Sequence, residues 1–70
     1  MEKKLTIDSE FITLAQALKF LDLVSSGGQA KFFLIENEIF VNGERETRRG
    51  RKLYPDDVIK FENQSYRINK

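Results

Sequence analysis

The chain has 70 residues, a formal net charge of +1, and neither cysteine nor histidine. This length suits one small domain, for which folding buries about 60% of the surface that the unfolded chain exposes. The missing residue types exclude a disulfide framework and thiolate metal sites, and they remove the usual neutral-pH base of enzymes. We therefore expect one domain over residues 1–70, with no catalytic residue, no metal and no cofactor.

The sequence indicates neither a membrane-spanning nor a secreted protein. No apolar run approaches the roughly 20 residues that cross a bilayer. The N-terminal residues also lack the apolar region and the small-residue cleavage site of a signal peptide. We expect a soluble, cytoplasmic monomer.

The first elements predicted are a short strand and a helix. Leu5 and Ile7 lie in an alternating run that predicts a strand with both side chains facing inward. Thr13 and Gln16 form a capping box that opens a helix over about residues 13–22. Its apolar stripe, at i, i+3, i+4, i+7 spacing, consists of Leu14, Ala17, Leu18 and Leu21.

A second helix is predicted after a short connection. Ser26 and Gln29 form another capping box, and Asn37 is a residue type that tolerates the left-handed conformation common at helix ends. The expected core face of this helix consists of Ala30, Phe33 and Leu34.

Beyond Asn37 the pattern becomes that of strands. Ile39 and Val41 alternate with polar or outward residues, and Asn42-Gly43 predicts a hairpin with a type I′ turn, after which residues 44–47 pair back. Residues 54–57 contain a proline and predict a turn.

Two further strands are predicted at the C-terminal end of the chain. They cover residues 58–62 and 65–69, and Asn63-Gln64 closes the hairpin between them. The predicted fold class is α+β, with two short helices packed on a small, mainly antiparallel sheet of four or five strands. The predicted core consists of Leu14, Leu18, Leu21, Ala30, Phe33, Leu34, Ile39, Val41 and Ile59.

Charge is unevenly distributed along the chain. Residues 1–44 carry a net charge of −3, whereas residues 45–70 carry +4. Within residues 45–52, Glu46 is the single acidic residue, against five basic ones: Arg45, Arg48, Arg49, Arg51 and Lys52. Arginine forks match phosphate geometry, but charged loops are also often only solvated, so from the residues alone we weigh these two interpretations equally.

The start of the second helix is a further candidate site. Gly27 and Gly28 would leave the first helical N–H groups open to an anion, with Lys31 one turn further on. The alternative is that these glycines only let the two helices cross closely.

Three apolar residues fall outside the predicted core face. Phe32, Ile35 and Phe40 are expected to be covered by the C-terminal hairpin, with Tyr66 and Ile68, as a satellite core. The alternatives are a surface for a protein partner, or aromatic rings on which unpaired bases stack.

Several motifs in this order resemble the RNA-binding domain of the small-subunit ribosomal protein S-four family, or alpha-L motif. The resemblance covers about residues 12–62 and includes a second helix, a hairpin strand ending in Val-Asn-Gly, and a later Asp-Val-Ile. The residues that carry it are Ser26, Ala30, Lys31, Phe33, Leu34, Ile39, Val41, Asn42, Gly43, Leu53, Asp57, Val58 and Ile59. Residues 25–28 and 48–53 look more specifically like the small YaaA/YbcJ-like proteins. Gly27 departs from the family in standing where many members have arginine, and Asp56 stands where glycine is usual.

The resemblance implies a non-catalytic module that binds structured, most plausibly ribosomal, RNA through phosphate contacts. The residues expected to bind RNA are Gly27, Gly28, Lys31, Arg45, Arg48, Arg49, Arg51 and Lys52. The competing hypothesis is a protein-interaction adaptor that uses Phe32, Ile35 and Phe40. A lone fragment of the pseudouridine synthases, which carry a similar domain, is set aside because nothing resembles their catalytic domain.

Overall fold

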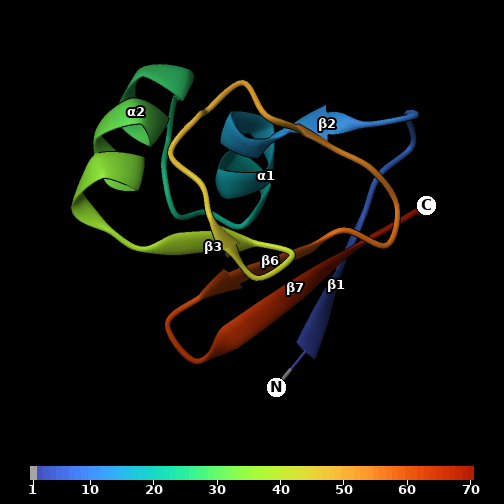
Figure 1. The fold of residues 1–70 in the computed structure, drawn as a ribbon. Helices are drawn as coiled ribbons and strands as arrows, with labels where there is room; N and C mark the ends of the chain where they lie inside the picture. The colour runs from blue at the N-terminus through green and yellow to red at the C-terminus, as the bar shows by residue number, and fades with distance from the viewer. Residues whose placement is uncertain (1) are drawn as a thin grey trace.

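The computed structural model describes residues 2–70. The helices and strands of this part of the chain are β1 (Glu2–Thr6), β2 (Ile12–Thr13), α1 (Leu14–Phe20), α2 (Gly27–Glu36), β3 (Ile39–Val41), β4 (Glu44–Arg45), β5 (Lys52–Leu53), β6 (Val58–Phe61) and β7 (Gln64–Asn69). Five strands form one sheet in the order β1-β7-β6-β3-β4, and both helices lie on one face of it (Figure 1). The predicted α+β class is confirmed.

The sheet joins the two ends of the chain. β1 pairs in parallel with β7, with Glu2 opposite Ser65 and Thr6 opposite Asn69, whereas the other neighbours in the sheet are antiparallel. The strand predicted around Leu5 is confirmed, and this residue faces the core. A second, two-stranded sheet was not predicted: β2 pairs with β5, placing Ile12 opposite Leu53.

Helix α1 begins with the predicted capping box and ends earlier than predicted. The Gln16 N–H donates to Thr13 Oγ1 at 3.2 Å, and the Thr13 N–H donates to Gln16 Oε1 at 2.8 Å. At the other end, Asp22 has φ of 62° and the Leu23 N–H donates to the carbonyl of Leu18 at 3.0 Å. This is a Schellman ending, with aspartate where glycine is usual, so the helix stops at Phe20 instead of residue 22.

Helix α2 begins at the predicted cap, with two differences in detail. Ser26 Oγ accepts the Gln29 N–H at 3.2 Å, but Gln29 Oε1 accepts from the N–H of Ser25 rather than that of Ser26. The left-handed end expected at Asn37 is wrong, because this residue is extended, with φ of −126°. Its side-chain Nδ2 instead donates to the Phe33 carbonyl, which satisfies an end carbonyl without a left-handed residue.

The core lies between the sheet and the helices. Most of the predicted core is buried, namely Leu14, Leu18, Ala30, Leu34, Ile39, Val41 and Ile59. Leu21 and Phe33 are only partly buried and pack against this core. The Phe33 ring lies 5.2 Å from the ring of Phe61. Beyond the predicted set, the core includes Ile12, Val24, Leu53, Tyr66 and Ile68.

The turns follow the predicted chemistry, with one shift of register. Asn42 and Gly43 have φ of 52° and 86°, as a type I′ turn requires. Asp56 has φ of 79° in the turn of residues 54–57, the conformation for which glycine is preferred. The last hairpin turns at Glu62 and Asn63, one residue earlier than predicted, because Gln64 already pairs with Phe61.

Candidate nucleic-acid interface

The basic segment, residues 45–52, crosses the N-terminal end of α1. The carbonyl of Arg51 accepts the Leu14 N–H at 2.8 Å, and the carbonyl of Arg49 accepts the Ala15 N–H at 2.9 Å. These donors belong to the first turn of α1, where N–H groups have no partner within the helix. In Figure 1 the segment arches over α1 and continues alongside β2. The backbone of the segment is therefore fixed to α1 and is not a loose solvated loop.

Glu46 organises the side chains of the basic segment. Only 5% of this residue is exposed. Its Oε2 accepts from Arg48 Nε at 3.1 Å and its Oε1 from Arg48 Nη2 at 3.0 Å, while Arg51 Nη1 donates to Oε1 at 2.9 Å. The N–H groups of Thr47 and Arg48 also donate to Oε2, each at 3.0 Å. One buried carboxylate thus receives hydrogen bonds from two arginines and two backbone amides.

The charge state of Glu46 follows from these contacts. Hydrogen bonds from the Arg48 guanidinium, assisted by Arg51 and opposed by burial, hold the pKa of the Glu46 carboxyl well below its ordinary value of 4.5. Glu46 is therefore ionised and offsets part of the charge of both arginines. The sequence prediction missed this role, although a single acid among five basic residues was a visible signal.

The two arginines differ in exposure. The Arg48 side chain is 74% exposed and still reaches solvent beyond Glu46, whereas the Arg51 side chain is only 26% exposed. Arg51 is thus held mainly inside the segment, and Arg48 presents part of its fork outward.

Arg49 links the basic segment to the start of α2. Its Nη1 donates to the carbonyl of Gly27 at 3.2 Å, and the side chain is exposed. The predicted juxtaposition of basic loop and helix N-terminus is therefore present in the structure. Lys31 is also exposed and lies one helical turn after Gly27, on the same side of α2.

The first turn of α2 is open. A Cβ atom added at Gly27 would meet nothing within 4 Å, and one at Gly28 would meet only Ser26 Oγ, at 3.8 Å. The interpretation that these glycines are needed for close helix crossing is therefore wrong. The two glycines therefore place no side chain over the first turn, whose N–H groups carry the positive end of the helix dipole.

Two of the candidate residues lie away from the start of α2. Arg45 Nη1 is 3.8 Å from Glu38 Oε2, and its Nη2 donates to the Asn37 carbonyl at 3.4 Å. This places Arg45 at the C-terminal end of α2, about 15 Å of helix from Gly27. Lys52 lies on β5, with its Nζ 5.0 Å from the centre of the Phe11 ring, an aromatic neighbour that the sequence did not indicate.

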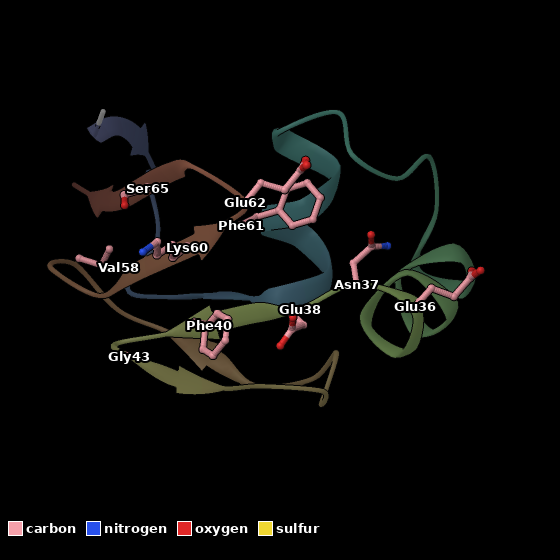
Figure 2. Close-up of a pocket in the computed structure, with 10 residues that line it drawn as sticks. All are labelled: Glu36, Asn37, Glu38, Phe40, Gly43, Val58, Lys60, Phe61, Glu62 and Ser65. Carbon is pink, nitrogen blue, oxygen red and sulfur yellow. The ribbon is translucent and has the colours of Figure 1, made fainter.

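The predicted cover over the outlying apolar residues is wrong. Phe32 and Ile35 are each 63% exposed, because β7 places Tyr66 and Ile68 in the main core beneath the helices instead. Phe40 is half-buried and lines a cavity of about 800 Å³ beside β6 (Figure 2). Neither Phe32 nor Ile35 lines that cavity, so the three residues do not surround one common site there.

The cavity in Figure 2 is a poor candidate for RNA. Its lining includes the carboxylates of Glu36, Glu38 and Glu62, against one amine from Lys60. Three carboxylates around one opening disfavour a polyanion.

Among residues 2–70, no group of three or more His, Cys, Asp or Glu side chains is placed to hold a metal ion. No helix in this part of the chain is long and apolar enough to cross a bilayer.

The fold and the basic segment define a small α+β domain of the type that the sequence resembles. A family model described as "S4 domain" matches residues 5–69, and the chain belongs to this family. The chain is also similar to the "Probable ribosome maturation protein RlbA" of Bacillus subtilis (strain 168), with 53% identity over 62 residues. The match covers 89% of this chain and 87% of that relative. The expected family resemblance is confirmed.

Proposed function

We propose that this protein is a non-catalytic, cytoplasmic RNA-binding module that binds structured ribosomal RNA through phosphate contacts. Membership of the S4-domain family and the ribosome maturation role in the relative's name support work with RNA or with the ribosome. The observation that carries the proposal is the contact of Arg49 with Gly27, because it joins exposed cations to an open helix N-terminus.

The proposed RNA contacts form groups according to their distance from the start of α2. Arg49, Lys31 and the Gly27-Gly28 amides form the central group around the start of α2. Arg48 and Lys52 extend this group along the basic segment, and Arg51 acts through Glu46 by holding the segment in shape. Arg45 meets a phosphate only if the RNA follows α2 to its C-terminal end. Phosphate contacts position the protein without reading bases, so the module recognises mainly the shape of the RNA.

The direct experiment is a salt titration of binding to protein-free ribosomal RNA. Because phosphate contacts release counterions, the affinity should fall steeply and linearly on logarithmic axes as salt increases. Absence of binding to this RNA at low salt would refute the proposed RNA-binding function.

The exposed pair Phe32 and Ile35 supports a second candidate, a protein-interaction adaptor. An apolar interface responds little to salt, unlike phosphate contacts. The adaptor is favoured if the protein binds intact ribosomes with little salt dependence, fails to bind protein-free ribosomal RNA, and loses ribosome binding in Phe32→Ser.

A further inference from the structure

The small β2–β5 ribbon has two unlike faces. Ile12 and Leu53 are paired across it and are both buried. Because side chains alternate along a strand, the neighbouring residues Phe11, Lys52 and Tyr54 lie on the opposite face. Their exposure agrees with this: Tyr54 is 48% exposed and Phe11 is partly exposed. The outer face of the ribbon therefore presents two aromatic rings and a lysine.

Phe11 contacts both of the other side chains. The rings of Phe11 and Tyr54 have their centres 5.7 Å apart and are tilted by 48°. Lys52 Nζ lies 5.0 Å from the centre of the Phe11 ring. Phe11 thus joins the Tyr54 ring and the lysine in one cluster, in which Tyr54 remains 48% exposed.

The backbone beneath Tyr54 is fixed on both sides. Its N–H donates to Asp57 Oδ2 at 2.8 Å, and its carbonyl accepts the Asp57 N–H at 3.0 Å. The other carboxylate oxygen, Asp57 Oδ1, accepts from Asn42 Nδ2 at 3.0 Å, which ties this turn to the β3–β4 turn. Because its backbone is already fixed, Tyr54 loses little backbone freedom when it binds a ligand.

We infer that the Phe11–Tyr54 pair is a stacking site for an unpaired RNA base, with Lys52 bound to a phosphate of the same strand. The inference rests on the proposed RNA-binding function and adds that the bound RNA has an unpaired nucleotide next to the structured part. The β2–β5 ribbon directly continues the basic segment, so one RNA strand can run from the cations of that segment to the ring of Tyr54. Paired bases inside a duplex cannot offer a face to Tyr54, whereas unpaired bases stack on aromatic side chains.

The absence of tryptophan from the chain allows a specific test. Tyr54→Trp introduces a single tryptophan, whose fluorescence changes when a base stacks on it. Protein-free ribosomal RNA should quench this fluorescence. Inorganic polyphosphate, which has phosphates and no bases, should occupy the cations without the same quenching. Quenching by both polymers alike would overturn the stacking site.

Affinity measurements on the same ribosomal RNA supply the second readout. Tyr54→Ala should weaken binding about fivefold or more, because stacking of one base contributes about that much. The salt slope should not change, since no phosphate contact is removed. Tyr54→Phe keeps the ring and should bind like the wild type. Phe20→Ala removes an exposed aromatic residue at the end of α1 and serves as the matched control, with unchanged affinity expected.

The outcomes separate this inference from the function on which it rests. If the wild type binds the RNA with a steep salt slope and Tyr54→Ala binds equally well, the stacking site is wrong and the RNA-binding function stands. If Tyr54→Ala loses binding to intact ribosomes but not to protein-free RNA, the ring contacts a protein instead. If the wild type does not bind the RNA at all, both proposals fail.

Discussion

The guanidinium of Arg49 donates a hydrogen bond to the carbonyl of Gly27 at 3.2 Å, between residues 22 positions apart in the chain. This contact brings the basic segment to the start of α2, whose first two residues are glycines with no side chain over the helix end. At α1 the equivalent donors are already bound to the carbonyls of Arg49 and Arg51. The two helix starts therefore have different roles, since one anchors the basic segment and the other remains open.

Gly28→Ala tests whether the open helix start binds an anion. Alanine fits here, because its Cβ would have only Ser26 Oγ, at 3.8 Å, within contact range. The substitution should raise the free energy of unfolding by about 0.4 to 1 kcal/mol. It should also weaken RNA binding, because a methyl group now stands near the amides. A stabilised variant with unchanged RNA affinity would show that these amides do not contact phosphate.

Glu46→Gln tests the carboxylate inside the basic segment. The amide keeps the shape of the side chain but loses charge-assisted hydrogen bonds, so the free energy of unfolding should fall by about 1 to 3 kcal/mol at neutral pH. Denaturant unfolding of both proteins measures this difference. RNA affinity should also fall, because Arg48 and Arg51 lose the group that orients them.

The difference in unfolding free energy between wild type and Glu46→Gln should depend on pH. Folding lowers the pKa of Glu46 below its ordinary value of 4.5, so its contribution to stability is fully present above that pH. The contribution is lost progressively as the pH falls below 4.5 toward the lowered value. The difference between wild type and Glu46→Gln should therefore be constant from neutral pH to about pH 5 and shrink below it. A constant difference down to pH 3 would contradict the assigned ion cluster.

Leu34 and Ile35 give a matched test of how α2 faces the core. Leu34 is fully buried, whereas its neighbour Ile35 is 63% exposed. Leu34→Ala should cost about 2 to 5 kcal/mol of unfolding free energy, and Ile35→Ala should stay within about 0.5 kcal/mol of the wild type. Thermal or denaturant unfolding measures both. Similar costs for the two variants would mean that the orientation of the helix is wrong.

The helices and the strands of the main sheet could be predicted because their signals are local, whereas the order of the strands could not, because it depends on long-range pairing such as that of β1 with β7. The cap at Thr13, the spacing of Leu14 and Leu18, and the Asn42-Gly43 turn each act over a few residues, and the structure confirms them. The predicted cover over Phe32 was wrong, because it depends on where β7 lies in the sheet.

The candidate site was harder to predict from the sequence than the helices and strands. β2 and β5 are two residues each, too short to show periodicity, and they pair across about 40 positions of chain. Without that pairing, the contact between the Phe11 and Tyr54 rings cannot be recognised. The role of Glu46 likewise depends on how the basic segment bends back, which the sequence does not show, although the single acid among five basic residues is visible in it.

Asn42 connects the two turns near β6, and its side chain can be tested apart from its backbone. Its Nδ2 donates to Asp57 Oδ1 at 3.0 Å, and its Oδ1 accepts the Val58 N–H at 2.9 Å. Asn42→Gly keeps the positive φ but loses both bonds, so unfolding free energy should fall by about 1 to 3 kcal/mol.

The backbone of the same residue is tested by Asn42→Pro. Proline cannot adopt φ of 52°, and it lacks the N–H that donates to the Val58 carbonyl at 2.8 Å. This variant should be far less stable than Asn42→Gly in thermal unfolding. Equal stability of the two variants would count against the type I′ hairpin.

We propose that RNA phosphates bind at the start of α2, beside the basic segment. The test variant combines Arg49→Ala with Lys31→Ala. The control combines Lys4→Ala with Lys60→Ala, which changes net charge equally. Lys4 comes directly before the buried Leu5, and Lys60 directly after the buried Ile59. Because side chains alternate along a strand, both exposed lysines lie on the sheet face away from the helices.

The deciding measurement is the salt dependence of affinity for protein-free ribosomal RNA in the wild type and both double variants. Each lost phosphate contact lowers the slope of log K against log salt by about 0.7 to 0.9. The Arg49/Lys31 variant should flatten the slope by about 1.4 to 1.8, and the Lys4/Lys60 control should leave it nearly unchanged. Equal flattening by the two variants would contradict a binding site at α2, because it would mean diffuse attraction to the net charge of the protein.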